Sequence, residues 1–197
     1  MVENEQIRDL LVQLNGEERE KAYKTLFMLM HESMTRFALT ILRSVEDTEE
    51  IYSDFFIKIW QKRAELHEID NPKLYFFVGI KNMALNKLAQ KKKQQSLSSE
   101  DWLNNMNSTF FNPEDMMLSD EAVKRIESII NSLPPKCRVI FKLVKEEGLK
   151  YAEVSKVLDI SIKTVEAQMG IALRRIKNET DFKNEFPELH SILTQKK

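Results

Sequence analysis

Residues 151–177 read YAEVSKVLDISIKTVEAQMGIALRRIK, and this stretch decides the fold of the C-terminal part of the chain. Its apolar residues recur at steps of three and four, a spacing that predicts amphipathic helices. Two helices are expected, from Tyr151 to Leu158 and from Ile162 to Lys177, on either side of Asp159-Ile160-Ser161. Ser161 is well placed to cap the second helix, because its hydroxyl can accept a hydrogen bond from a backbone N–H of the first turn.

Two short helices joined by a three-residue turn have the dimensions of a helix-turn-helix, whose second helix lies in the major groove of DNA. The residues that would then face base edges are Lys163, Thr164, Glu166, Ala167 and Gln168, while Arg174, Arg175 and Lys177 extend the cationic surface. Glutamine can pair with adenine, glutamate can accept from cytosine, and lysine is better suited to a phosphate. An ordinary helical hairpin within a bundle is the alternative interpretation.

A second segment, residues 71–93, combines aromatic rings with cations on one expected helix that begins after Asn71-Pro72. Its notable side chains are Tyr75, Phe76, Phe77, Lys81, Asn82, Asn86, Lys87 and the run Lys91-Lys92-Lys93. Aromatic faces stack unpaired bases while lysines hold the backbone, which suits separated DNA strands better than intact duplex. Core packing is the alternative for any single ring, since three adjacent rings cannot all face outward.

An acidic run precedes this segment and consists of Glu46, Asp47, Glu49, Glu50 and Asp54. Two carboxylates could bind a metal ion, but no histidine lies near them at ligand spacing, so no metal site is expected. A solvated helix face is the default interpretation of such a run. A protein-binding face is the functional interpretation, because Ile51, Phe55 and Ile59 can bury the opposite side of the helix.

The net charge of -1 conceals a strong segregation of charge along the chain. Residues 72–95 contain six lysines and no acidic residue, residues 94–123 contain six acidic residues and no Lys or Arg, and residues 124–178 contain twelve Lys or Arg against six Asp or Glu. Two cationic regions can each contact phosphates, and the anionic segment between them cancels their charge in the total. Chance segregation of solvated helix faces is the alternative.

The composition narrows the class of protein. A single cysteine, Cys137, excludes an internal disulfide framework and a cysteine-rich zinc site. No apolar run approaches the roughly 18–20 residues that cross a bilayer, and the acidic start argues against a secretory signal. We therefore expect a cytoplasmic protein without membrane insertion. No nucleophile–base pair or Gly-rich phosphate loop is visible, so neither catalysis nor a cofactor is expected.

The order of these patterns predicts an all-α fold with two small helical domains joined by a flexible linker. The first domain is expected over residues 1–95 and the second, which contains the helix-turn-helix, over residues 120–178. Residues 96–119 are rich in Ser and Asn and lack basic residues, which indicates an acidic linker. Residues 179–197 are expected to form a loose or short helical tail.

Several segments in this order resemble the extracytoplasmic-function sigma factors, the smallest members of the sigma-70 family. Residues 47–60, DTEEIYSDFFIKIW, resemble the family's polymerase-binding helix, and residues 72–88, PKLYFFVGIKNMALNKL, resemble its helix for the -10 promoter element. Residues 133–138, 147–155 and 160–168 are similar to the domain that reads the -35 element. The resemblance covers roughly residues 26–93 and 120–177.

The resemblance implies a sigma factor that binds the core of RNA polymerase, recognises the -10 and -35 elements and helps to melt promoter DNA. The residues it assigns to polymerase binding are Asp47, Glu50, Ser53 and Asp54. Those assigned to the -10 element are Tyr75, Phe77, Lys81, Asn82 and Lys87, and those assigned to the -35 element are Lys163, Thr164, Glu166, Ala167, Gln168 and Arg174. Residues 66–71 fall where the family captures a flipped base, and an anti-sigma factor is a candidate partner.

The chain departs from the family pattern at several positions. Gly79 replaces an aliphatic residue and should cost about 1 kcal/mol of helix stability relative to alanine. Asp159 replaces a turn glycine, which is tolerable because aspartate accepts left-handed backbone better than most residues. Gly170 and Ile171 replace polar or basic residues of the recognition helix. A conventional helix-turn-helix regulator that binds only duplex DNA is the alternative function, and an anti-sigma-like or scaffold helical protein is a third.

Overall fold

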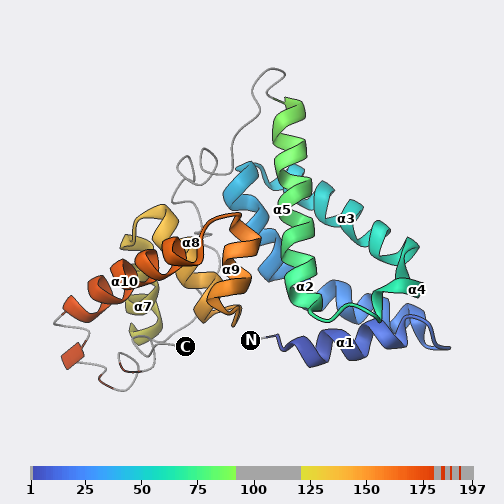
Figure 1. Ribbon diagram of the computed structural model, residues 1–197, viewed down its shortest axis with the longest axis horizontal. Helices are drawn as coiled ribbons and strands as arrows, with labels where there is room; N and C mark the ends of the chain where they lie inside the picture. The colour runs from blue at the N-terminus through green and yellow to red at the C-terminus, as the bar shows by residue number, and fades with distance from the viewer. Residues whose placement is uncertain (1, 92–120, 180–182, 185–186, 188–190, 192–197) are drawn as a thin grey trace. The chain divides into compact units, whose positions relative to one another are not determined.

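The computed structural model describes residues 2–91 and 121–179, together with residues 183, 184, 187 and 191. All regular secondary structure in these ranges is α-helix, so the expected all-α fold is confirmed (Figure 1). The chain divides into two compact units, Met1–Ser98 and Ser99–Lys197, which are described separately. The predicted linker and most of the predicted tail lie outside the described residues. None of the described helices combines the length and the apolar composition of a membrane span.

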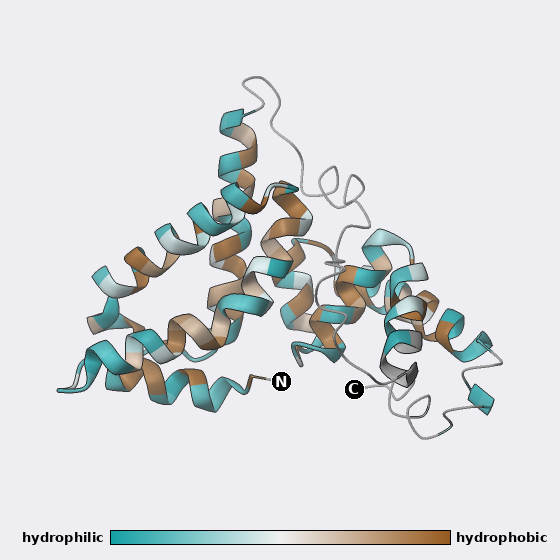
Figure 2. Cartoon of the chain, turned by 180° about the vertical axis from the view of Figure 1, so that it is seen from behind, coloured by the Kyte–Doolittle hydropathy of each residue, from teal (hydrophilic) through white to brown (hydrophobic). Residues whose placement is uncertain are grey.

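The first unit is built around its longest helix, α2. Its helices are α1 (Asn4–Gln13), α2 (Arg19–Leu42), α3 (Val45–Gln61), α4 (Arg63–Leu66) and α5 (Pro72–Lys91). Helix α2 packs against α1, α3 and α5, and α3 also packs against α5. Apolar residues recur every three or four positions along these helices, so that each helix turns an apolar face toward the core (Figure 2).

A polar side chain accepts a backbone hydrogen bond at the N-terminal end of each of α3 and α5, the two helices of the first unit that carry predicted site residues. Ser44 caps α3, where its Oγ accepts a hydrogen bond from the Asp47 N–H at 3.2 Å. Asn71 stands before α5, and its Oδ1 accepts from the Leu74 N–H at 3.0 Å. The expectation that a helix begins after Asn71-Pro72 is therefore confirmed, since the proline occupies the first turn, where a missing N–H costs no intrahelical bond.

The core of the first unit is rich in aromatic rings from α2, α3 and α5. Phe55 lies 5.4 Å from Phe76 and 5.9 Å from Phe56, measured between ring centroids, and all three are buried. Tyr52 is buried as well and donates its hydroxyl to the Phe27 carbonyl at 2.5 Å. Burial is the main cause that raises the pKa of this phenol. The polar end of the ring is thus satisfied inside the core, as buried tyrosines require.

Gly79 brings α5 into close contact with α3. A Cβ built at this position would lie 3.1 Å from Cζ of the Phe55 ring and still closer to Cε2, well inside van der Waals contact. The ring has little room to move, because it is packed between the neighbouring aromatic side chains. The helix-propensity cost of this glycine, expected from the sequence, therefore has a structural reason in the close approach of the two helices.

The second unit contains α7 (Glu121–Ser132), α8 (Pro135–Lys145), α9 (Tyr151–Leu158) and α10 (Ile162–Asn178), with α10 packed on α8 and α9. Helices α9 and α10 begin and end within one residue of the expected limits. Asp159 adopts φ 56°, in the left-handed region, as expected. The Ser161 Oγ accepts from the Thr164 N–H at 3.0 Å, which confirms the predicted cap.

Arginine side chains hold the joint between α7 and α8. Arg138 is buried and donates from Nη2 to the carbonyls of Asn131 and Leu133, the latter at 2.9 Å. Arg175 of α10 reaches the Ser132 carbonyl at 3.4 Å. These carbonyls lie at the C-terminal end of α7, where they have no intrahelical partner and where the helix dipole favours cations. Burial lowers the pKa of Arg138, and its hydrogen bonds compensate for the lost hydration.

Two glycine-to-alanine variants should change stability in opposite directions. At Gly79 the added Cβ overpacks the core, which costs about 1–3 kcal/mol and exceeds the gain of about 1 kcal/mol in helix propensity. At Gly170, in α10, a Cβ meets no atom within 4 Å, so only the propensity gain remains. Urea unfolding should show Gly79→Ala below the wild type and Gly170→Ala above it.

A Phe55→Leu background supplies the control for the glycine comparison. It removes the ring that the new methyl group would strike, so Gly79→Ala should no longer destabilise in that background. Equal effects of Gly79→Ala in both backgrounds would contradict the proposed clash.

Candidate functional site

Helix α3 presents a mainly polar outer face, which also exposes Ile57, and an apolar inner face. Glu50, Ser53 and Asp54 are exposed, whereas Ile51 and Phe55 are buried, as is Ile59 one turn further on. The expectation that these apolar residues bury the opposite side of the acidic run is therefore confirmed. Asp47 differs from the other predicted polymerase-binding residues, since only 9 % of its side chain is exposed. It is a poor candidate for contact with a separate protein.

Ion pairs join the acidic face of α3 to the lysines of α5. The Lys87 Nζ lies 2.6 Å from Oε1 of Glu50 and 4.0 Å from Oδ1 of Asp47. The Lys91 Nζ lies 2.5 Å from Oδ2 of Asp47. The sequence patterns predicted one partner for the carboxylates and another for the lysines, but they did not predict that the two sets face each other. We call these four residues the α3–α5 ion-pair cluster.

The pKa values in this cluster move in the directions that ion pairing requires. The pKa of Asp47 is lowered, chiefly by the hydrogen bond from Lys91 and further by the Ser44 hydroxyl, which outweigh its desolvation. The pKa of Lys87 is raised, chiefly by its hydrogen bond to Glu50. Both groups are therefore charged at neutral pH, and each stabilises the charge of the other.

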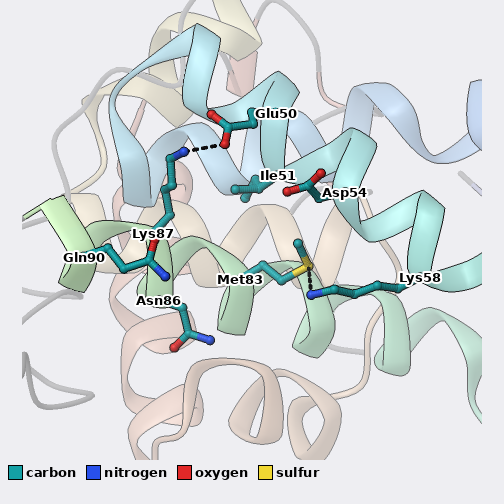
Figure 3. Close-up of a pocket in the computed structure, with 8 residues that line it drawn as sticks. All are labelled: Glu50, Ile51, Asp54, Lys58, Met83, Asn86, Lys87 and Gln90. Carbon is teal, nitrogen blue, oxygen red and sulfur yellow. Dashed lines mark hydrogen bonds and ion pairs between the residues drawn. The ribbon is translucent and has the colours of Figure 1, made fainter.

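A shallow hollow of about 220 Å³ lies beside the cluster, between α3 and α5 (Figure 3). Its lining residues are Glu50, Ile51, Asp54, Lys58, Met83, Asn86, Lys87 and Gln90. The Lys58 Nζ lies 3.7 Å from the Met83 sulfur and so crosses from one helix to the other. Among the described residues, no group of three His, Cys, Asp or Glu side chains is placed to hold a metal ion.

The structure separates the residues predicted to engage the -10 element. Asn82 is exposed, and Tyr75 is half-buried with its ring edge-on to Phe76 at 6.1 Å. Phe77 is fully buried and lies 5.5 Å from Phe37 in the core. The prediction that Phe77 contacts DNA is wrong for this structure, because a ring with no accessible face cannot stack on a base. Lys81 is only 8 % exposed, which leaves it little surface for a phosphate.

Helix α1 anchors the loop that precedes α5. Arg8 donates from Nη2 to the Asp70 carbonyl at 2.5 Å, across 62 positions of the chain. Beside it, Asn4 accepts from the Lys73 N–H at 2.9 Å, and the buried Lys73 Nζ reaches the Val2 carbonyl at 2.8 Å. No sequence pattern predicted these roles of Arg8 and Lys73. No periodicity in the chain pairs residues so far apart.

Helix α10 turns most of the residues predicted for the -35 element outward. Lys163, Glu166, Ala167 and Arg174 are exposed. Thr164 is half-buried, with its hydroxyl 2.8 Å from that of Ser161. The structure therefore brings the four exposed side chains to one helix, with an N-terminal cap that fixes where the helix begins.

Gln168 behaves differently from the other predicted -35 residues. It is half-buried, and its Oε1 accepts a hydrogen bond from Sγ of Cys137, in α8, at 2.8 Å. Burial raises the pKa of the Cys137 thiol, so sulfur keeps the proton that it donates. Pairing with adenine needs both the amide oxygen and the amide nitrogen of glutamine. With its oxygen turned to α8, Gln168 does not offer that pair in this conformation.

Comparisons with known proteins agree with this arrangement. The family model for sigma-70, region 4, matches residues 124–176. RfaY of Xanthomonas campestris pv. campestris, described as a probable RNA polymerase sigma factor, is 26% identical over 163 residues, 81% of this chain and 40% of that protein. The ECF RNA polymerase sigma-E factor of Escherichia coli K12 is 34% identical over 68 residues, 34% of this chain and 36% of that protein. The chain thus spans about two fifths or less of the length of these relatives.

A solved structure, that of CnrH in complex with the cytosolic domain of CnrY, is also similar. The match covers 89% of this chain and 97% of the matched chain, with a TM-score of 0.51 and 17% sequence identity. At this identity the likeness concerns the fold alone.

Acidification should weaken the first unit through Asp47. Its folded-state pKa is lowered, so its contribution to stability is present above the unfolded-state pKa of about 3.9 and is lost as pH falls through the folded-state value. The urea midpoint of the wild type should therefore decline progressively as the pH falls below about 5. Asp47→Asn and Lys91→Met should both show a shallower decline, and a wild-type slope in both would contradict the assignment.

Proposed function

The chain belongs to the extracytoplasmic-function group of the sigma-70 family, and from that premise we propose that it is a sigma factor that binds RNA polymerase and directs initiation at promoters. The observation that carries the proposal is the extent of the region 4 match, which begins within α7, includes all of α8 and α9, and ends two residues before the end of α10. The exposed residues of α10 are Lys163, Glu166, Ala167 and Arg174. They offer cations for phosphates beside a carboxylate and a methyl group for base edges.

The outer face of α3 is the proposed contact with the polymerase core. Glu50, Ser53 and Asp54 are exposed there on a helix whose other side is buried, so docking needs no change in the core of the unit. Asp47 is left out of this proposed contact, because its carboxylate already interacts with Lys91 and Ser44. Its proposed role is to stabilise the position of α5 through the ion pair with Lys91.

Helix α5 is the proposed contact with the -10 element. Tyr75, Asn82 and Lys87 keep enough exposed surface to reach DNA, whereas Phe77 supports the helix from within the core. An aromatic ring, an amide and a cation in one helix suit an unpaired strand, on which the ring stacks and the cation meets the backbone. Lys81 is almost fully buried, so its proposed contact with DNA is limited to the small part of its side chain that is exposed.

Helix α10 is the proposed contact with the -35 element in duplex DNA. Lys163 and Arg174 would neutralise phosphates, and Glu166 and Ala167 would lie against base edges. Thr164 and Gln168 support the helix through Ser161 and Cys137 in this structure, so any base contact by Gln168 requires its amide to turn.

The proposal includes a regulatory partner and a place of action. The solved structure of CnrH contains the cytosolic domain of CnrY. We propose that this chain also binds a second protein, an anti-sigma factor. A factor that works on RNA polymerase acts in the cytoplasm, and the chemistry proposed for this chain needs no cofactor and no catalytic residue of its own.

Transcription reconstituted with purified core polymerase tests the central claim. The wild type should support promoter-specific initiation on genomic fragments, and Glu50→Lys combined with Asp54→Lys should abolish both initiation and co-elution with core, because charge reversal opposes docking. The matched control is Glu17→Lys combined with Glu20→Lys, which reverses two exposed carboxylates outside α3. A protein that binds duplex DNA but never co-elutes with core would instead be a conventional regulator.

Duplex binding tests the role of α10. Lys163→Ala and Arg174→Ala should each weaken binding to all sequences and lower the slope of log K against log salt by about 1, since each removes one phosphate contact. Glu166→Ala should change base preference at one position with little change in the salt slope. Lys183→Ala, an exposed lysine after α10, is the control and should leave the slope unchanged.

A further inference from the structure

The α3–α5 ion-pair cluster joins two surfaces to which the proposed function gives different partners. Glu50 is proposed to face the polymerase and Lys87 to face DNA, yet the two side chains meet at 2.6 Å in the chain by itself (Figure 3). An ammonium group paired with a carboxylate is less available to a phosphate, which is also an anionic oxygen acceptor. The same pairing occupies an acceptor that a cationic partner of α3 would use.

We propose that Glu50 is an internal competitor of DNA phosphate for Lys87, so that occupation of Glu50 by a cationic partner frees Lys87 for single-stranded DNA. This inference rests on the proposed function and adds to it the coupling between its two binding surfaces. Binding at α3 and binding at α5 then strengthen each other, although no group belongs to both interfaces at once.

The geometry of the cluster selects Glu50, rather than Asp47, as the exchangeable partner. The Glu50 side chain is 56 % exposed, whereas that of Asp47 is 9 % exposed and accepts from Lys91. A separate protein can therefore reach Glu50 without disturbing the core. Asp47, 4.0 Å from the Lys87 Nζ, stays in place and keeps the lysine near its present position after Glu50 is withdrawn.

The size of the effect follows from the exposure of the pair. Ion pairs between partly exposed side chains typically change an equilibrium by about two- to fivefold. Loss of the Glu50 partner should therefore raise the affinity of Lys87 for a phosphate by about that factor. Coupling between two binding events is reciprocal, so the same factor should appear in the affinity for polymerase when Lys87 is removed.

The first arm of the experiment measures binding of the full chain to a fluorescent single-stranded oligonucleotide. Glu50→Gln should bind about two- to fivefold more tightly than the wild type. Its slope of log K against log salt should be steeper by about 0.7, the value for one more phosphate contact on a single strand. In a Lys87→Gln background, Glu50→Gln should have no effect on either quantity.

Glu49→Gln is the matched control for charge. It removes the same charge from the adjacent residue of α3, but Glu49 faces α2, where its carboxylate lies 3.1 Å from Nε2 of His31. It should leave both the affinity and the salt slope for single-stranded DNA close to those of the wild type. An equal gain from Glu49→Gln and Glu50→Gln would reduce the effect to net charge and overturn the proposal.

The second arm measures binding to core polymerase without DNA. Lys87→Gln should bind core about two- to fivefold more tightly than the wild type, because it frees Glu50. The coupling would be overturned if Lys87→Gln bound core no more tightly than the wild type does. It would also be overturned if the effects of Glu50→Gln and Lys87→Gln on DNA binding were additive. Either result would leave the sigma-factor proposal standing. Failure of the wild type to bind core at all would instead overturn both.

Discussion

The contact between α3 and α5 is the constraint on which the first unit depends. One residue in every four along α5 meets α3: Gly79 at the Phe55 ring, Met83 at Lys58, Lys87 at Glu50 and Lys91 at Asp47. Residues at this spacing lie on one face of a helix. The absence of a side chain at Gly79 lets the helices approach closely, and the approach brings the polar groups two and three turns later within hydrogen-bonding distance.

This arrangement explains why an apolar core and a charged seam coexist between the same two helices. Phe55 and Phe76 exclude water at one end of the contact, while Lys87 and Glu50 remain partly exposed at the other. Buried ion pairs must repay a large desolvation cost, whereas partly exposed pairs keep much of their hydration and can exchange partners. The aromatic core therefore provides the stability of the contact. The α3–α5 ion-pair cluster provides charged side chains that can exchange partners at little cost in free energy.

The sequence predicted most of the fold because the fold follows from local rules. The limits of α9 and α10, the Ser161 cap and the left-handed Asp159 all depend on residues within a few positions of one another. The site was harder to predict, because periodicity identifies the polar side of a helix but not the element that faces it. Phe77 was thus assigned to DNA although Phe37 covers it, and Asp47 to a partner although Lys91 holds it.

A usable signal for the ion-pair cluster was nevertheless present in the sequence. Lys87 and Lys91 continue the four-residue series of Gly79 and Met83, and an α5 without a single carboxylate must find its counter-ions on another helix. Helix α3 carries more carboxylates than any other helix of the first unit. Arg8 and Gln168 had no such signal. The partner of Arg8 is a backbone carbonyl, which every residue carries, and the thiol partner of Gln168 lies 31 positions away on another helix.

The two units differ in how their cations are used, and this difference bears on the order of binding. In the first unit Lys87 and Lys91 already have carboxylate partners, so a phosphate must compete for them. In the second unit Lys163 and Arg174 are exposed on α10 and need no such exchange. If α10 contacts duplex DNA as proposed, that contact would need no prior exchange of ion pairs. Under the same proposal, contact of α5 with a separated strand would gain strength once another molecule has taken over the carboxylates of α3, so strand capture would follow polymerase binding.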